Sequence, residues 1–260
     1  MPTFTSNDTQ INYQTFGDAS KPALVFSNSL GTKLSMWQSQ IEFFRNSHYV
    51  ICYDTRGHGA SEAPNGPYTI DQLGQDVVNL LDHLNVKKAA FCGISMGGLT
   101  GQWLAIHHST RFSHVVICNT AAKIGQEQGW LDRAALVRQQ GLAPIASTAA
   151  GRWFTDPFIQ SNPAVIEQLS YDLGAGSPEG YSSCCEALAK ADVREQLKDI
   201  AIPVLIVAGI QDPVTTVADG VFMQERITGS QLFEINASHI SNVEQPDAFN
   251  QALIQFIQVI

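Results

Sequence analysis

The pentapeptide Gly93-Ile94-Ser95-Met96-Gly97 contains the residue of this sequence best suited to nucleophilic chemistry. A Gly-x-Ser-x-Gly pattern is informative when a strand precedes it and a helix follows. The sharp turn between them then presents the serine hydroxyl above the end of a sheet. Here an apolar run at 89–92 precedes the pattern, and a helix-like segment at 95–108 begins within it. We therefore predict that Ser95 is a nucleophile.

A serine hydroxyl is a weak nucleophile, so an imidazole must accept its proton. Among the seven histidines of the chain, His239 directly follows the last strand-like run. A loop at this point can hold an imidazole over the end of the sheet. His58 lies in the turn Arg56–Ser61, where a structural role is the better interpretation. We predict that His239 is the general base.

The imidazole in turn needs an acid that orients it, and in a strand-turn-helix hydrolase this acid lies between the serine and the histidine in chain order. Asp212 satisfies this order and follows the apolar run at 203–208 directly. Asp219 is a weaker candidate, because it lies where a helix is expected to begin. The preceding strand ends at Asn119, whose side chain cannot carry the charge. The predicted acid is therefore Asp212.

Acyl transfer through a tetrahedral intermediate also needs preorganised donors for its oxyanion. The backbone N–H of Met96, directly after the nucleophile, is one predicted donor. The other is expected from the loop Asn28-Ser29-Leu30-Gly31, which follows an apolar strand-like run. We predict the backbone N–H of Leu30 as this second donor.

Short β-branched runs alternate with helix-like segments along the chain, which is typical of a mostly parallel sheet covered by helices on both faces. The helix-like segment at 70–84 has one apolar face and begins with the capping pair Thr69 and Gln72. Further helices are predicted at 95–108 and 247–257. The runs predicted as strands are 11–15, 23–27, 49–53, 89–92, 115–118, 204–208 and 232–235, the first two forming an antiparallel edge.

The strand-like runs stop after Thr120 and return at Pro203. Between them, 123–189 reads as helical pieces separated by prolines and glycines. We predict that this segment is a helical cap over the carboxyl edge of the sheet, where open α/β sheets hold their ligands. The predicted core then comprises 1–122 and 190–260.

Composition and charge indicate which partners are unfavourable and which compartment is expected. The chain has 260 residues and a formal net charge of -9, which makes nucleic acid and anionic membranes unfavourable partners. No signal-peptide pattern occurs at 1–18, and the apolar runs are too short to span a bilayer. Five cysteines, an odd number, favour a reducing compartment. We expect a cytoplasmic protein, either a monomer or a small homo-oligomer.

Several longer segments resemble the 3-oxoadipate enol-lactonase family of the α/β-hydrolase superfamily. They are Tyr53–Gly59, Cys92–Trp103, Cys118–Ala121, Glu179–Leu188 and Ser238–Asn242, together with the Asn28–Gly31 loop. The resemblance covers essentially the whole chain. It implies an α/β-hydrolase fold with a mostly parallel eight-stranded sheet. It also implies hydrolysis of 3-oxoadipate enol-lactone to 3-oxoadipate in bacterial aromatic-compound catabolism, in the protocatechuate or catechol branch, with no metal or cofactor.

The implied substrate carries a carboxylate, which the acidic protein as a whole would not attract. A local cation should therefore hold it, most naturally an arginine of the cap. The candidates are Arg133, Arg138 and Arg152, with Lys123 less favoured. The side chains of Trp130 and Trp153 are predicted as apolar walls of the pocket.

Two alternatives stay open at the level of the sequence. The same triad serves a cofactor-free carboxylesterase, a perhydrolase or a carbon–carbon bond hydrolase. A hydrolase scaffold can also serve as a non-catalytic ligand receptor, because fold alone does not fix function. The complete set of serine, acid and histidine weighs against the receptor.

Overall fold

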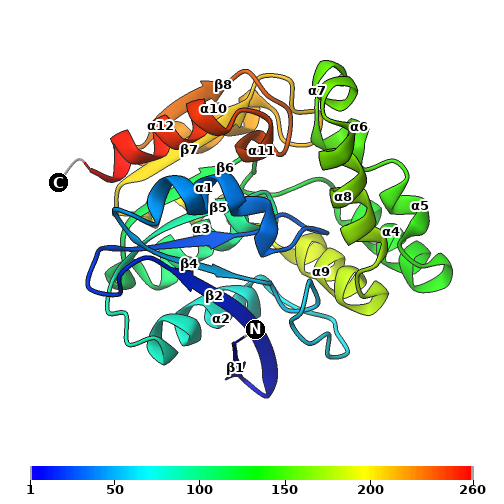
Figure 1. Cartoon of the computed structure of the whole chain (residues 1–260), viewed down its shortest axis with the longest axis horizontal. Helices are drawn as coiled ribbons and strands as arrows, with labels where there is room; N and C mark the ends of the chain where they lie inside the picture. Colours follow the sequence, from blue (N-terminus) through cyan, green and yellow to red (C-terminus); the bar gives the residue numbers. More distant parts are fainter. Residues whose placement is uncertain (1, 259–260) are drawn as a thin grey trace.

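The sheet is the centre of the molecule. The computed structural model describes residues 2–258, and within them eight strands form one sheet in the order β1-β2-β4-β3-β5-β6-β7-β8 (Figure 1). The pairs from β4 to β8 are parallel, whereas β1 and β2 are antiparallel additions at one edge. The strands are β1 (Thr3–Ser6), β2 (Thr9–Phe16), β3 (Ala23–Ser27), β4 (Tyr49–Tyr53), β5 (Ala89–Ile94), β6 (Phe112–Cys118), β7 (Val204–Gly209) and β8 (Gln231–Ile235). The predicted eight-stranded, mostly parallel sheet is confirmed.

Two details of the predicted sheet were wrong. The short strand β1 was not predicted, because Thr3–Ser6 has a polar sequence with no run of apolar residues. The prediction also placed Ala23–Ser27 at an antiparallel edge, but β3 lies inside the sheet and pairs in parallel with β4 and β5. All five residues of β3 are buried, as expected of a strand covered on both faces.

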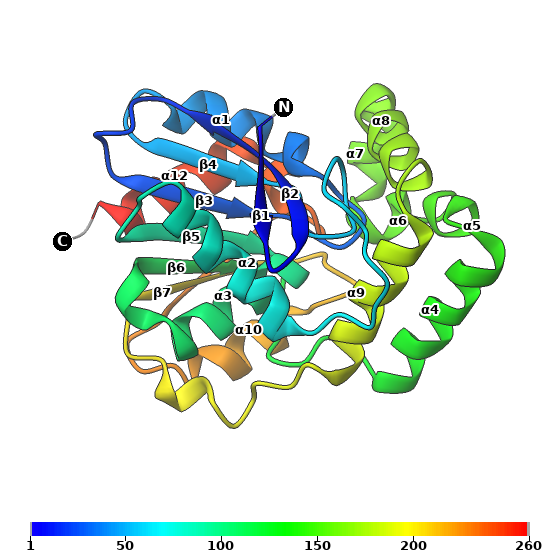
Figure 2. The ribbon, with the colours of Figure 1, turned by 90° about the horizontal axis from the view of Figure 1, so that it is seen from below.

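Helices cover both faces of the sheet (Figure 2). On one face lie α1 (Gln38–Phe44) and α12 (Pro246–Ile257), and on the other lie α2 (Ile70–His83), α3 (Met96–His107) and α10 (Val217–Gln224). The predicted capping box at the start of α2 is present: the Thr69 hydroxyl accepts from the Gln72 backbone N–H at 3.2 Å, and the Gln72 side chain accepts from the Thr69 N–H at 3.0 Å. None of the helices described, between residues 2 and 258, has the length and apolar character needed to cross a membrane.

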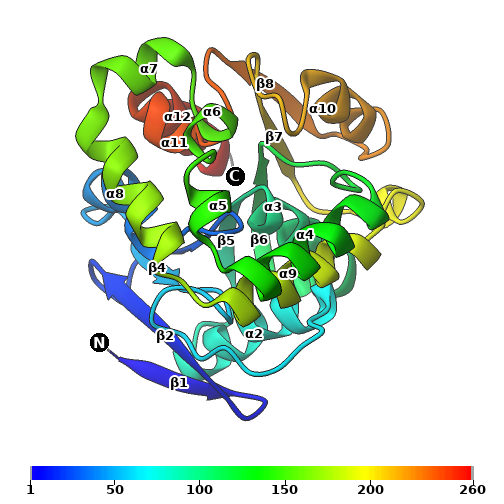
Figure 3. The same cartoon turned by 90° about the vertical axis from the view of Figure 1, so that its right-hand side faces the viewer.

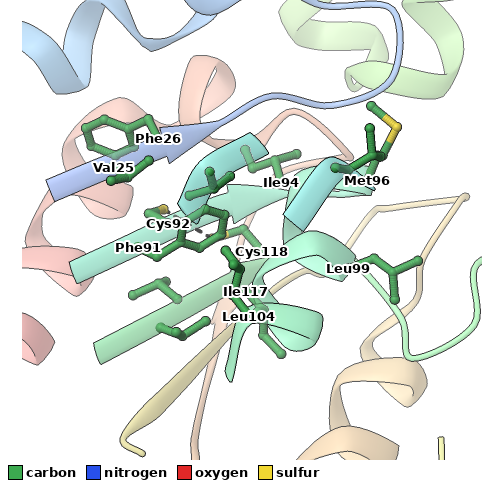
Figure 4. Packing of buried hydrophobic residues seen from close by; sticks show 14 of the residues in the cluster. Val25, Phe26, Phe91, Cys92, Ile94, Met96, Leu99, Leu104, Ile117 and Cys118 are labelled. Carbon is green, nitrogen blue, oxygen red and sulfur yellow. Dashed lines mark hydrogen bonds between the residues drawn. The ribbon is translucent and has the colours of Figure 1, made fainter. Parts of the chain in front are cut away.

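Fully buried side chains surround the junction where β5 passes into α3. Val25, Phe26, Phe91 and Cys92 are fully buried around this junction, and Figure 4 shows their side chains packed beside the start of α3. The short elements η1 (Leu34–Trp37), η2 (Ser109–Arg111), η3 (Leu197–Asp199) and α11 (Ser241–Glu244) complete the core. This packing gives the nucleophile turn a rigid base.

Six helices lie between β6 and β7, beyond the carboxyl ends of the parallel strands (Figure 3). They are α4 (Glu127–Gln140), α5 (Ala143–Ala146), α6 (Ala150–Trp153), α7 (Asp156–Ser161), α8 (Pro163–Gly174) and α9 (Pro178–Lys190). We refer to this helical segment, 127–190, as the cap. The prediction that residues 123–189 form a separate cap domain stays a prediction.

Two glycines allow the cap to approach the core closely. Gly57, with a φ of +77°, follows the end of β4, and Gly180 is the third residue of α9. A Cβ atom added at Gly180 would lie 2.2 Å from the Gly57 carbonyl oxygen, so the two backbones are in direct contact. No side chain can be inserted here without moving α9.

We predict that Gly180→Ala reduces the free energy of unfolding by about 1–3 kcal/mol, because the added methyl group overpacks a backbone contact. Gly129→Ala is the matched control. Gly129 is the third residue of α4, and an added Cβ has no neighbour within 4 Å. This control should be neutral or stabilising by up to about 1 kcal/mol, since alanine favours the helix. Urea unfolding of both variants measures the difference; equal effects would contradict the interpretation.

Candidate active site

Ser95 lies at a sharp turn between β5 and α3. Its backbone has a φ of +57° and a ψ of -113°, a conformation that costs a non-glycine residue about 1–3 kcal/mol. The Ser95 N–H donates to the Cys118 carbonyl at 2.9 Å, and the Thr120 hydroxyl donates to the Ser95 carbonyl at 2.8 Å. A Cβ atom added at Gly97 would lie 2.3 Å from the Ser27 carbonyl oxygen, so a larger residue does not fit there. The structure thus holds the serine in a strained turn at the carboxyl edge of the sheet.

His239 and Asp212 form a buried pair at the same edge. The Nδ1 atom of His239 lies 2.8 Å from Oδ2 of Asp212. The carboxylate also accepts hydrogen bonds from the Thr215 hydroxyl at 2.8 Å and the Val214 N–H at 2.7 Å. Because Nδ1 faces the carboxylate, it carries the proton of the neutral imidazole, and Nε2 is the basic nitrogen. Ser95 and His239 line one cavity.

Asp212 is held in its ionised form. Burial acts to raise the pKa of Asp212, but the hydrogen bond and charge of His239, together with the N–H groups of Val214 and Thr215, lower it overall. An ionised carboxylate at this position orients the imidazole and stabilises the imidazolium that forms when Nε2 accepts a proton. Asp219, the weaker candidate acid, is the third residue of α10, where its carboxylate accepts from the Thr216 N–H and hydroxyl.

Asn119 has a role that the sequence did not reveal. Its Nδ2 donates to Asp212 at 3.1 Å and to the Ser238 carbonyl at 3.0 Å, while its Oδ1 accepts from the Ser241 hydroxyl at 2.6 Å. One amide therefore connects the acid to the loop that carries His239. The sequence signal for Asn119 is its position directly after β6. From the sequence, that position indicates only that no carboxylate follows this strand.

Two backbone N–H groups are free to act as oxyanion donors. The N–H of Gly97 donates to the Asn28 carbonyl at 3.1 Å, and that of Gly31 donates to Nε2 of His58 at 2.9 Å. Across residues 2–258, no hydrogen bond uses the N–H of Leu30 or of Met96, the residues that precede these two. The structure is therefore consistent with the predicted donors.

The side chains of Asn28 and His58 hold the loop that contains Leu30. Asn28 donates from Nδ2 to the Tyr53 carbonyl at 2.9 Å and accepts from the Trp37 indole at 2.9 Å. His58 can accept from Gly31 only when Nε2 is unprotonated, and burial lowers the pKa of His58. The polar residues that distinguish this loop are thus used to fix its backbone.

The cavity above Ser95 has a volume of about 330 Å³, at the small end of the range for ligand pockets. The cap side chains that line it include Trp130, Arg133, Arg152, Trp153 and Tyr181. The Arg133 guanidinium stacks on the Trp130 ring at 4.9 Å from its centroid. Burial, with a smaller effect of the Arg133 charge, lowers the pKa of Arg152. Neither arginine forms a salt bridge within the described residues, so the cavity has excess positive charge.

Two of the predicted carboxylate ligands, Arg138 and Lys123, lie outside the cavity. Arg138 is exposed and pairs with Glu179 and Glu186, joining α4 to α9. Lys123 pairs with Asp192 at 3.5 Å. Neither residue lines the cavity, and we therefore do not retain them as carboxylate ligands. In the part of the chain that the structure describes, no group of three or more His, Cys, Asp or Glu side chains is placed to hold a metal ion.

Comparison with known proteins agrees with this geometry. The model of the α/β hydrolase fold family matches residues 22–246, which include all three residues of the candidate triad. The chain belongs to the α/β-hydrolase family. It is 66% identical to 3-oxoadipate enol-lactonase 2 of Acinetobacter baylyi over 96% of this chain and 94% of the relative. Identity to 3-oxoadipate enol-lactonase 1 of the same organism is 47%, over 96% of this chain and 94% of that protein.

A solved structure with a similar fold is also that of an enol-lactonase. The enol-lactonase of Burkholderia xenovorans superposes with a TM-score of 0.97 and 42% identity, covering 99% of this chain and 100% of the other. The resemblance found in the motifs is thereby confirmed, as is the prediction that this α/β-hydrolase chain is an enzyme of the hydrolase class.

We predict that Asp212→Asn destabilises the protein by about 1–3 kcal/mol at pH 7, because the amide cannot accept all of the donors around the carboxylate. Since the folded-state pKa of Asp212 is lowered, its stabilising effect is present above the unfolded pKa of about 3.9 and is lost as the pH falls through the folded value. The gap between wild type and variant should therefore shrink below about pH 4. Chemical unfolding at pH 7 and pH 3.5 measures it; a gap that widens in acid would contradict this assignment.

Proposed function

We propose that the chain hydrolyses 3-oxoadipate enol-lactone to 3-oxoadipate through a covalent acyl-enzyme on Ser95. The observation that carries the proposal is a cavity that is lined by Ser95, by the histidine bonded to Asp212, and by two arginines that have no carboxylate partner among residues 2–258. This combination suits a substrate with a reactive lactone carbonyl and a carboxylate. The two enol-lactonases of Acinetobacter baylyi, at 66% and 47% identity, support the same substrate.

The first step forms the acyl-enzyme. The Ser95 hydroxyl attacks the lactone carbonyl while Nε2 of His239 takes its proton, and Asp212 stabilises the imidazolium. The N–H groups of Met96 and Leu30 stabilise the oxyanion of the tetrahedral intermediate. The ring C–O bond then breaks, and the imidazolium returns the proton to the departing enol oxygen.

The leaving group stays attached to the acyl chain as an enol. An enol leaves more easily than an alkoxide, and its conversion to the ketone removes the nucleophile that could close the ring again. Water activated by His239 then attacks the Ser95 ester, and the serine is released with the product acid. The steps use groups of this chain, the substrate and one water molecule, with no metal or cofactor.

The cap supplies the recognition of the carboxylate. We propose Arg133 as the principal contact, since it lines the cavity, has no carboxylate partner in the part of the chain that the structure describes, and is oriented by stacking on Trp130. Arg152 adds positive charge nearby, and Trp153 provides an apolar wall. These local charges overcome the unfavourable net charge of -9.

The setting follows from this substrate. We place the reaction in the cytoplasmic catabolism of aromatic compounds, where the lactone is an intermediate of the protocatechuate and catechol branches. All five cysteines are buried and free, which fits a reducing compartment.

Purified enzyme should prefer the enol-lactone to p-nitrophenyl acetate by kcat/KM, and Ser95→Ala should reduce turnover of both by about 10⁴-fold or more, because the nucleophile is lost. A substrate panel measured by ultraviolet absorbance tests this. A wild type with no preference for the lactone would reject the substrate. A Ser95→Ala variant as active as wild type would reject the mechanism.

Arg133→Met should raise the KM for the enol-lactone by about 10- to 100-fold, because a charge-assisted contact worth about 1.5–3 kcal/mol is lost. The effect on p-nitrophenyl acetate, which has no carboxylate, should be much smaller. Arg138→Met is the matched control, since Arg138 lies on the same helix but outside the cavity. Equal effects of the two variants on the KM for lactone would argue against Arg133 as the carboxylate ligand.

A further inference from the structure

The loop that carries His239 is connected to the cap on both sides of the histidine, through Glu244 before it and directly after it. Before it, the Ser238 N–H donates to Oε2 of Glu244 at 2.8 Å. After it, the Ile240 N–H donates to the Trp153 carbonyl at 3.0 Å. The other oxygen of Glu244 accepts from Thr155, both from its N–H at 3.3 Å and from its hydroxyl. Glu244 therefore connects the cap to the histidine loop with one oxygen directed to each.

Glu244 is buried, whereas glutamate side chains are mostly exposed in proteins. It ends the short helix α11, is only 7% exposed, and forms no salt bridge among residues 2–258. A buried carboxylate without a cation is costly unless it is fully hydrogen-bonded. Three neutral donors, the Ser238 N–H and the N–H and hydroxyl of Thr155, offset the cost of burying this carboxylate. Hydrogen bonds to a charged acceptor are stronger than those between neutral groups.

Thr155 is used in an equally unusual way. It is the N-cap residue of α7, where a threonine side chain ordinarily accepts a backbone N–H of its own helix. Here the side chain makes no such bond and donates to Glu244 instead. Two residues earlier, Trp153 lines the cavity above Ser95. The segment from Trp153 to Thr155 thus contacts both the ligand cavity and the histidine loop.

We propose that Glu244 is a positioning residue that couples the cap to His239. A substrate held by the cap fixes the segment from Trp153 to Thr155, and the carboxylate transmits that position to Ser238 and the adjacent imidazole. Displacements of about 1 Å at a catalytic group can cost 100-fold in rate, so a small shift in this link alters turnover. The inference rests on the proposed function, because it takes His239 as the base and the lactone as the substrate.

Thr155→Val tests the cap end of the link, because it removes the hydroxyl while keeping the shape of the side chain. The kcat for the enol-lactone should fall about 10-fold relative to the kcat for p-nitrophenyl acetate, which carries no carboxylate for the cap to hold. The lactone KM should change little. Ser161→Ala is the matched control, since its exposed hydroxyl bonds to the Pro157 and Phe158 carbonyls and to the neighbouring Asn162 side chain, all of them at α7 and away from Glu244. This control should leave the ratio of the two kcat values unchanged.

Glu244→Gln tests the histidine end. The amide keeps the size of the side chain, but only its oxygen can accept, so its NH2 group faces either the Ser238 N–H or the Thr155 N–H without a hydrogen bond, and one side of the link is lost. We expect kcat to fall for both substrates, since the position of His239 matters to each. Melting temperatures measured alongside separate these effects from loss of folded protein.

The outcomes distinguish this inference from the function on which it rests. A Thr155→Val variant that lowers both kcat values equally, or neither, in an enzyme that hydrolyses the lactone would overturn the coupling alone. A wild type that hydrolyses p-nitrophenyl acetate but not the lactone would overturn the proposed function as well. A selective loss of lactone turnover in Thr155→Val, together with a general loss in Glu244→Gln, would support the coupling.

Discussion

The strained turn at Ser95 is the constraint on which the rest of the structure depends. A residue with a φ of +57° persists only where its surroundings hold it, and here β6, β3 and α3 all contribute. The Ser95 N–H is bonded to the end of β6, and the Gly97 N–H to the Asn28 carbonyl after β3. The turn that exposes the serine therefore also fixes the loop with the proposed second oxyanion donor.

The histidine loop depends on two buried carboxylates with different tasks. Asp212 contacts the imidazole, whereas Glu244 contacts the backbone of the residue before it. Asn119 joins the first carboxylate to the Ser238 carbonyl, so both sides of Ser238 are held by side-chain hydrogen bonds. A network of this kind, with its polar groups paired, rigidifies the loop that it holds.

The net charge of the chain and the charge that lines the cavity have opposite signs. The chain as a whole is acidic, but the cavity above Ser95 is lined by Arg133 and Arg152, which have no carboxylate partner between residues 2 and 258. Other cap and flanking cations, such as Arg138 and Lys123, are neutralised by nearby carboxylates. The packing of each cap arginine therefore decides whether its charge is compensated by a carboxylate.

The sequence by itself determined seven of the eight strands, three of the helices that cover the sheet, the triad candidates and the family. Ser95, Asp212 and His239 each follow an apolar run directly, and the ends of parallel strands meet at one edge, so local pattern sufficed to group them. Only the tertiary structure decided that β3 lies inside the sheet, that Arg138 faces away from the cavity, and that His58 holds the Gly31 loop. It also brought Thr155 to Glu244, 89 positions apart in the chain. Such contacts depend on how distant segments pack and where each side chain points, and residue type and spacing do not carry that information.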